Sequence, residues 1–242
     1  MSILRDIFFD VPYNPNEDVL AELVGKSEDE RNKITTADYE MNYKKRNFNF
    51  RLQTRCIASS YIYHLGKFKN DKCWRIIIQC VPSIDMEPGA FGGFYNIQVK
   101  LDINSFLKLS DIDKKRKTLE LINNALLELV EIEGWDKGIF ENASNKVILE
   151  NYVNKRIWKK QKNSPGRQYI AKVLLEHDLY KSEISIIITD KSGVIVKQEK
   201  VAEDLPDEWA YAKYFGELKW FSNTELALVS KSKEHEFRIK LD

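Results

Sequence analysis

The amino-acid sequence predicts an α+β protein, with an antiparallel sheet covered by a helix and, after it, a smaller antiparallel β-rich domain. Two observations predict this class. Segments in which apolar and polar residues alternate recur along the chain, as expected for strands with one face in water. One long segment instead has apolar residues at three- and four-residue spacing, as in an amphipathic helix. We expect an N-terminal α+β domain at 1–140, a connecting helix and linker at 141–165, and a C-terminal β-rich domain at 166–242.

The N-terminal domain is predicted to hold three strands and one long helix. Alternation predicts strands at about 48–56, 74–81 and 97–103. The helix is expected between Ser110 and Gly134, because Ser110 begins a pattern resembling a capping box and Gly134 suits a left-handed C-terminal cap. We expect the apolar stripe of this helix to cover the dry face of the sheet.

The rest of the chain is predicted to be one helix followed by a meander. The connecting helix is expected at about 142–161, and the turn residues at 163–166 end it. A short helix is expected at about 206–214. Alternation and turn residues predict short strands at 169–175, 184–188, 194–196, 217–221, 225–229 and 236–241.

The composition excludes several classes of function. The 38 Lys and Arg residues face 37 Asp and Glu residues, so a net charge of +1 gives no long-range attraction to nucleic acid or anionic lipid. Three cysteines, Cys56, Cys73 and Cys80, are an odd number without a CxxC pair, which indicates reduced thiols. The N-terminus lacks a signal-peptide pattern, and no apolar run approaches a membrane span. We therefore expect a cytoplasmic protein that does not contact a membrane.

One pair of short motifs is similar to the bare pattern of the PD-(D/E)xK nucleases: Pro206-Asp207 followed by Glu217-Leu218-Lys219. In that family the Asp and Glu hold a divalent metal and the Lys supports the attacking water. The resemblance implies these catalytic roles for Asp207, Glu217 and Lys219, which are the groups that metal-assisted hydrolysis needs. Pro206-Asp207 also suits an ordinary helix start. A metal-dependent nuclease stays an alternative function.

A cationic stretch around Trp158 gives a second alternative, a nucleic-acid-binding accessory protein. Lysine and arginine side chains can contact phosphates while the indole stacks on a base. The competing interpretation is a solvated helix end, where cations complement the helix dipole. The cations in question are Lys155, Arg156, Lys159, Lys160 and Lys162.

Large apolar side chains in turns and at helix ends favour a protein partner. Residues of these types anchor interfaces more often than their abundance suggests. The candidates are Met86 and Phe91 in the loop 82–93, and Trp158, Trp209 and Tyr211. The alternative is that most of them belong to the core, and that the loop only connects two strands.

No dinucleotide, P-loop or nucleophile-elbow motif occurs, and the histidines have no metal-ligand spacing, so we expect no cofactor and no metal. The sequence therefore favours a non-enzymatic protein-binding protein. Its composition, rich in Lys, Asn and Ile, has the style of bacterial immunity proteins, which inhibit a cognate toxin. This likeness is one of style and not of motif, and it makes a toxin inhibitor the most concrete expectation.

Overall fold

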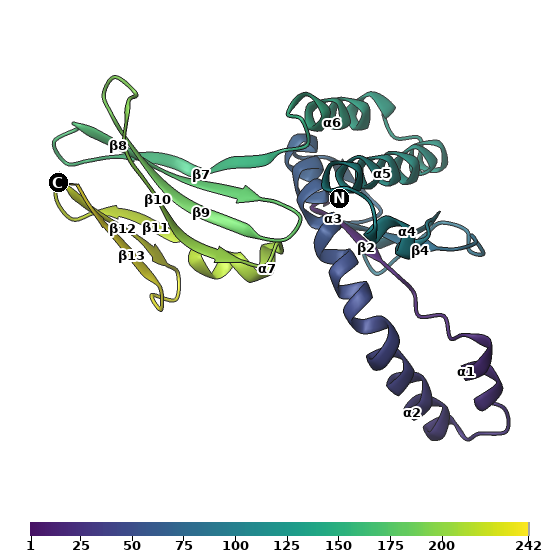
Figure 1. Cartoon of the computed structure of the whole chain (residues 1–242). Coiled ribbons are helices and arrows are strands. Elements are labelled where there is room, and N and C mark those ends of the chain that lie inside the picture. The colour runs from purple at the N-terminus through teal and green to yellow at the C-terminus, as the bar shows by residue number, and fades with distance from the viewer. Residues whose placement is uncertain (242) are drawn as a thin grey trace. The chain divides into compact units, whose positions relative to one another are not determined.

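The computed structural model describes residues 1–241, apart from the side chain of Lys160, and forms two compact units, Met1–Tyr152 and Val153–Asp242. The first unit is rich in helices and the second is rich in strands (Figure 1). The α+β class is thus confirmed. The division falls between Tyr152 and Val153, inside the segment that we expected to be a connecting helix.

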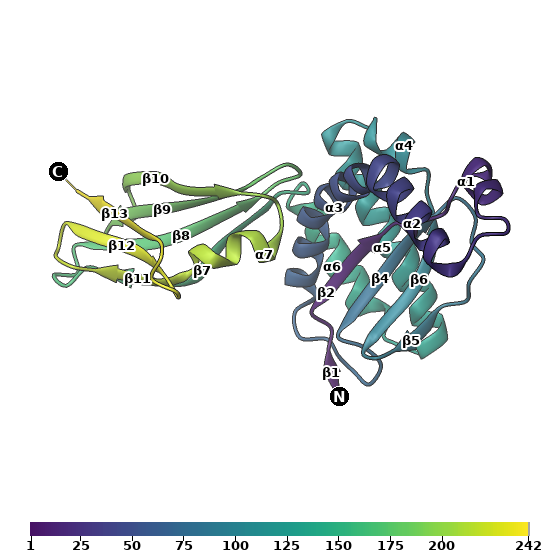
Figure 2. The same cartoon turned by 90° about the horizontal axis from the view of Figure 1, so that it is seen from below.

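The N-terminal unit is a four-stranded sheet with helices packed on it. Strand order is β2-β4-β6-β5, and a short β1-β3 pair lies apart from it. Figure 2 shows β2, β4 and β6 with α5 and α6 behind them. The elements are β1 (Ser2–Ile3), β2 (Asp6–Asp10), α1 (Glu17–Glu22), α2 (Glu28–Asp38), a π-helical turn (Tyr39–Tyr43), α3 (Lys44–Leu65), β3 (Lys69–Asn70), β4 (Arg75–Val81), β5 (Gly89–Phe91), β6 (Phe94–Lys100), α4 (Ile103–Leu107), α5 (Asp111–Glu133) and α6 (Lys137–Leu149).

The direction of the strands in this sheet needs a correction. We expected antiparallel pairing, but β2 pairs with β4 and β4 pairs with β6 in parallel, and only β5 and β6 are antiparallel. Parallel neighbours require a crossover, and α3 provides the one between β2 and β4. Alternation of apolar residues shows that a strand has one wet face, but it carries no information about strand direction.

The predicted strand at 48–56 is also wrong, because this segment lies inside helix α3. The buried positions of α3 recur at helical spacing, and Asn47 and Thr54 are among them. Because these two buried residues are polar, the sequence does not show a continuous apolar stripe for this helix. Phe48, by contrast, is 49% exposed, although the strand interpretation placed it on the buried face together with Phe50.

Helix α5 confirms the predicted helix between Ser110 and Gly134. The Ser110 hydroxyl accepts a hydrogen bond from the Asp113 backbone N–H at 3.3 Å, and Gly134 ends the helix at a φ of 65°. Its buried stripe includes Leu119, Ile122, Leu126 and Leu129. The strands expected near 74–81 and 97–103 correspond to β4 and β6. The second of these ends early, at Lys100, because α4 begins at Ile103.

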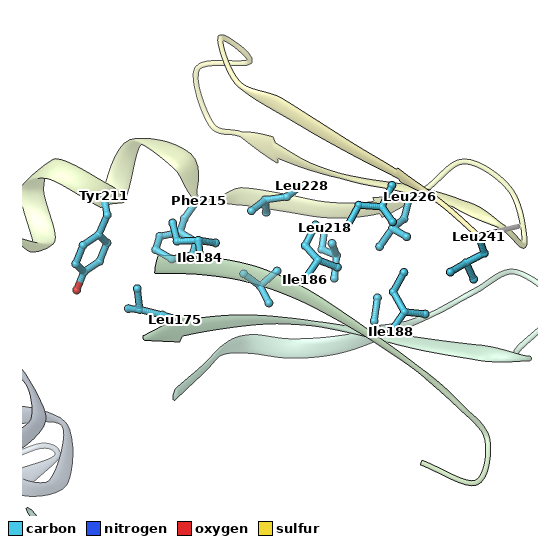
Figure 3. Packing of buried hydrophobic residues seen from close by; sticks show 13 residues of the cluster. Leu175, Ile184, Ile186, Ile188, Tyr211, Phe215, Leu218, Leu226, Leu228 and Leu241 are labelled. Carbon is cyan, nitrogen blue, oxygen red and sulfur yellow. The ribbon is translucent and has the colours of Figure 1, made fainter. Parts of the chain in front are cut away.

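The C-terminal unit consists of two antiparallel sheets, with strand orders β10-β9-β8-β7 and β11-β12-β13. Its core lies between them, where Ile184, Ile186 and Ile188 face Leu218, Leu226 and Leu228 (Figure 3). The β-rich character of this region is confirmed. The elements are β7 (Asn154–Asn163), β8 (Tyr169–His177), β9 (Ser182–Asp190), β10 (Ile195–Asp204), α7 (Glu208–Tyr211) with a 3-10 turn (Ala212–Tyr214), β11 (Gly216–Trp220), β12 (Glu225–Ser230) and β13 (Glu236–Lys240).

The connecting helix expected within 141–165 is the remaining correction. Helix α6 ends at Leu149, and β7 is a strand whose Asn154, Arg156 and Trp158 side chains are more buried than those of Lys155 and Ile157. Two of the three inward residues are polar, so the alternation of β7 is not visible as an apolar pattern. Lys155, Lys159 and Lys162, which suggested a helix end, are instead exposed residues of this strand.

Candidate functional site: the uncovered face of the N-terminal sheet

The N-terminal sheet is covered by helices on one face. Along β2, Ile7 and Phe9 are buried, whereas the intervening Phe8 is only half-buried, and β4 repeats this alternation. Figure 2 looks onto the other side of the sheet, where no helix lies in front of the middle of β2 and β4. We call this side the open face, and it consists of Asp6, Phe8, Asp10, Arg75, Ile77, Gln79, Phe94, Asn96 and Gln98.

Aromatic rings and guanidinium groups share the open face. Strand register places Phe8 beside Ile77, and Phe94 beside Arg75. The Arg75 guanidinium carbon lies 4.7 Å from the ring centre of Trp74, 5.5 Å from that of Phe8 and 6.0 Å from that of Phe94. Arginine stacks well on aromatic rings, so these contacts give a flat surface that combines apolar rings with a guanidinium group.

Ion pairs from helix α3 and strand β4 fix the charges of this face. Asp6 accepts a hydrogen bond from Arg55 Nη1 at 3.0 Å, and it pairs with Arg75 Nε at 2.8 Å. Arg51 pairs with Asp10. Because these carboxylates and guanidiniums neutralise one another, the open face does not offer a cluster of free cations to a phosphate. Its charged groups are instead held in one geometry before any partner arrives.

The loop 82–93 adjoins the open face and is held by one buried side chain. Gln98, which is 6% exposed, accepts hydrogen bonds at its Oε1 atom from the backbone N–H groups of Asp85 (2.8 Å) and Met86 (3.1 Å). Its Nε2 atom donates to Asp85 Oδ1 at 2.8 Å. The ordered loop presents Ile84, Met86 and Phe91 to solvent, with exposed fractions of 57%, 57% and 84%.

The candidate binding residues from the sequence therefore separate into two groups. Met86 and Phe91 are exposed beside the open face, and Trp209 is 83% exposed at the start of α7. Trp158 is half-buried and stacks on Phe215 with ring centres 4.7 Å apart. Tyr211 is 4% exposed and lies in the core, which corrects its assignment as a surface anchor.

Sequence reasoning missed the open face itself, of which Phe8, Arg75, Ile77 and Phe94 are the central residues. The segment Asp6–Asp10, with the sequence DIFFD, is a short apolar run between two aspartates, which could have identified a strand. The run would not have shown which face stays uncovered, because that depends on where the helices pack.

The residues of the nuclease pattern occupy structural positions. Asp207 is the N-cap of α7, where its Oδ1 atom accepts the Trp209 backbone N–H at 2.8 Å. Glu217 and Lys219 lie on the solvent side of β11, and Leu218 between them is in the core. In the described part of the chain, no group of three His, Cys, Asp or Glu side chains is placed to hold a metal ion.

The cations of β7 do not form a single stripe, since successive strand residues point to opposite faces. Lys155 pairs with Glu176 at 2.7 Å, whereas Arg156 donates to the Tyr211 hydroxyl at 3.3 Å. Lys159 and Lys162 are exposed. The side chain of Lys160 lies outside the described residues.

The three thiols are buried and are not placed for nucleophilic chemistry. Burial raises the pKa of Cys73 to about 11, with a smaller contribution from the nearby Glu133 carboxylate. Burial also raises the pKa of Cys80, and Asp10 adds to this effect. Since the thiolate is the reactive form, both groups are unreactive at neutral pH.

Among residues 1–241, no helix combines the length and the apolar character needed to cross a bilayer. No family model matches the chain, and neither the curated proteins nor the solved structures include one similar to it. The open face and the loop beside it are therefore the features from which a function has to be argued.

Proposed function

We propose that this chain is a non-enzymatic protein-binding protein that holds its partner on the open face and the loop 82–93. The observation that carries the proposal is a sheet with parallel strands whose second face has no helical cover. Parallel strands are usually buried on both faces, so an uncovered one is unusual. A partner that covers it would complete the arrangement.

The chemistry of the open face supports a protein as the partner. Aromatic residues, Met and Arg are enriched where protein interfaces gain most of their binding energy. Phe8, Arg75 and Phe94 supply such residues on the face, and Met86 and Phe91 supply them on the loop. Because Gln98 already orders the loop, little conformational entropy is lost on binding.

The more specific form of the proposal is an immunity protein, a cytoplasmic inhibitor of a cognate bacterial toxin. Three buried cysteines that form no disulfide suit a reducing compartment. An inhibitor of this kind needs a rigid surface and no catalytic residues, and the open face provides such a surface.

The proposal is tested by capture of partners from the native cell with the tagged full-length chain. We expect one stoichiometric protein that survives moderate salt and is lost with Ile77→Ser and with Phe91→Ser. Ile187→Ser is the matched control, because Ile187 is also a half-buried strand residue, on β9 of the other unit. A protein captured equally by all variants would contradict the open face as the site. Recovery of nucleic acid alone would contradict a protein partner.

The toxin inhibitor is tested separately, by expressing the captured partner alone and together with the chain. We expect the partner to arrest growth alone, and the wild-type chain and the Ile187→Ser control to restore it. A partner that is harmless alone would refute the immunity role while leaving protein binding intact.

A further inference from the structure

The C-terminal unit contains a cavity of about 430 Å³ between β7 and β11, each of which is an edge strand of its sheet. A cavity of this size lies within the range of small-molecule sites, about 300–1,000 Å³. It is lined by Trp158, Lys159, Lys162, Val173, Gly216, Glu217 and Leu218.

One part of the cavity wall is apolar and fixed. Val173 and Leu218 belong to the core, with exposed fractions of 1% and 5%, and the indole of Trp158 is held by its stacking on Phe215. The pairing of β7 with β8 shifts register between Trp158 and Lys162. Such a bulge bends the strand locally, and Lys159 within it has a positive φ of 54°.

Two hydrogen bonds join the edge strands beside the cavity. Lys159 Nζ donates to the Gly216 carbonyl oxygen at 3.3 Å, and Trp220 Nε1 donates to the Lys162 carbonyl oxygen at 3.2 Å. The Lys159 ammonium also lies 4.3 Å from the ring centre of Trp158. The apolar wall therefore already has a lysine ammonium beside it. The long Lys159 side chain can turn from this position toward a ligand.

Two opposite charges on the lining have no partner. Within the described residues, neither the Lys162 ammonium nor the Glu217 carboxylate makes an ion pair or a side-chain hydrogen bond. Some other charged residues in this unit do pair, as Lys155 does with Glu176 at 2.7 Å and Lys181 does with Glu183 at 2.6 Å. An unpaired cation and an unpaired anion thus flank the same apolar cavity.

We propose that this cavity binds a small zwitterion with an apolar side chain, of the amino-acid class. The apolar side chain lies against Trp158, Val173 and Leu218. The ligand carboxylate contacts Lys162, and the ligand ammonium contacts Glu217. A simple anion or a simple cation would use only one of the two unpaired charges. The inference is independent of the partner bound on the open face, which belongs to the other unit.

The experiment is titration calorimetry of the full-length chain with phenylalanine, phenylacetate and phenethylamine, which share a ring and differ in charge. We expect phenylalanine to bind about twofold to fivefold more tightly than either singly charged compound, since each exposed charge contact adds modestly. Glu217→Gln should remove its advantage over phenylacetate, and Lys162→Gln should remove its advantage over phenethylamine.

Glu87→Gln and Lys191→Gln are the matched controls, because both residues are exposed and lie outside the cavity lining. Neither should change the order of the three affinities. The proposal is overturned if none of the three compounds binds, if phenylacetate or phenethylamine binds as tightly as phenylalanine, or if the two cavity variants behave like the controls.

Discussion

The two units each present a sheet face to solvent, and the two faces differ in chemistry. The outer face of the C-terminal four-stranded sheet carries lysine and glutamate pairs, such as Lys155 with Glu176 and Lys200 with Glu183. The open face of the N-terminal sheet carries Phe8, Ile77 and Phe94, with a guanidinium stacked on the rings. The first is a solvated surface that combines these pairs with aliphatic side chains, among them Ile157 and Ile187. The second has a composition suited to burial, and this difference is why we assign partner binding to it.

The largest expected effect comes from two neighbouring isoleucines of β4. Ile76 is fully buried under the helices, whereas Ile77 is half-buried on the open face. Ile76→Ala should lower the free energy of unfolding by about 2–5 kcal/mol, and Ile77→Ala by about 1 kcal/mol or less. Urea unfolding followed by circular dichroism measures both. Equal losses would mean that the open face is buried within the chain itself.

The next effect concerns the charges that order the open face. Asp6→Asn removes the carboxylate shared by Arg55 and Arg75, and it leaves a mostly buried guanidinium without its ion pair. We expect a loss of about 2 kcal/mol in the free energy of unfolding, measured by the same urea titration. A variant as stable as the parent chain would show that this network does not hold helix α3 on the sheet.

The corresponding change on the solvated face should be smaller. Glu183 pairs with Lys181 at 2.6 Å and with Lys200 at 3.3 Å, but the lysines are about half exposed. Glu183→Gln should change the free energy of unfolding by less than about 1 kcal/mol, because water screens such pairs. A loss as large as that of Asp6→Asn would remove the distinction between the two faces.

The smallest effect is a titration on the same solvated face. Hydrogen bonds from Lys200 and then Lys181 lower the pKa of Glu203 to about 2. Because the folded-state pKa is below that of the unfolded chain, the stabilisation is present above the unfolded value and is lost as the pH falls toward 2. Carboxyl NMR should give a midpoint near this value, and Lys200→Gln should raise it. An ordinary midpoint would show that the pair is not formed in solution.

Some elements of this fold are predictable because local signals agree with one another. Helix α5 has a Ser110 cap, an apolar stripe and a terminal Gly134, and the C-terminal strands have turn residues at both ends. Helix α3 and strand β7 escaped prediction because Thr54 and Arg156 occupy buried or half-buried positions where the pattern needs apolar residues. Whether a polar residue at such a position is buried depends on the tertiary structure, and the local sequence does not show it.

The candidate site is predictable to a smaller extent. Met86 and Phe91 could be selected as exposed apolar residues of a loop rich in glycine. The residues of the open face could not be selected in this way, since Phe8 and Ile77 have the same residue types as the buried Phe9 and Ile76. Only the packing of the helices on one side separates them.

The Arg55 side chain has one further consequence, for self-association. Strand β2 is at the edge of its sheet, and an edge strand offers main-chain groups on which another chain can form a new strand. Arg55 Nη1 donates to the Ile7 carbonyl oxygen at 3.0 Å, so one acceptor of this strand is already occupied. An incoming strand would have to compete with a guanidinium that is also anchored to Asp6. The same arginine that orders the open face thus protects the adjacent edge from aggregation.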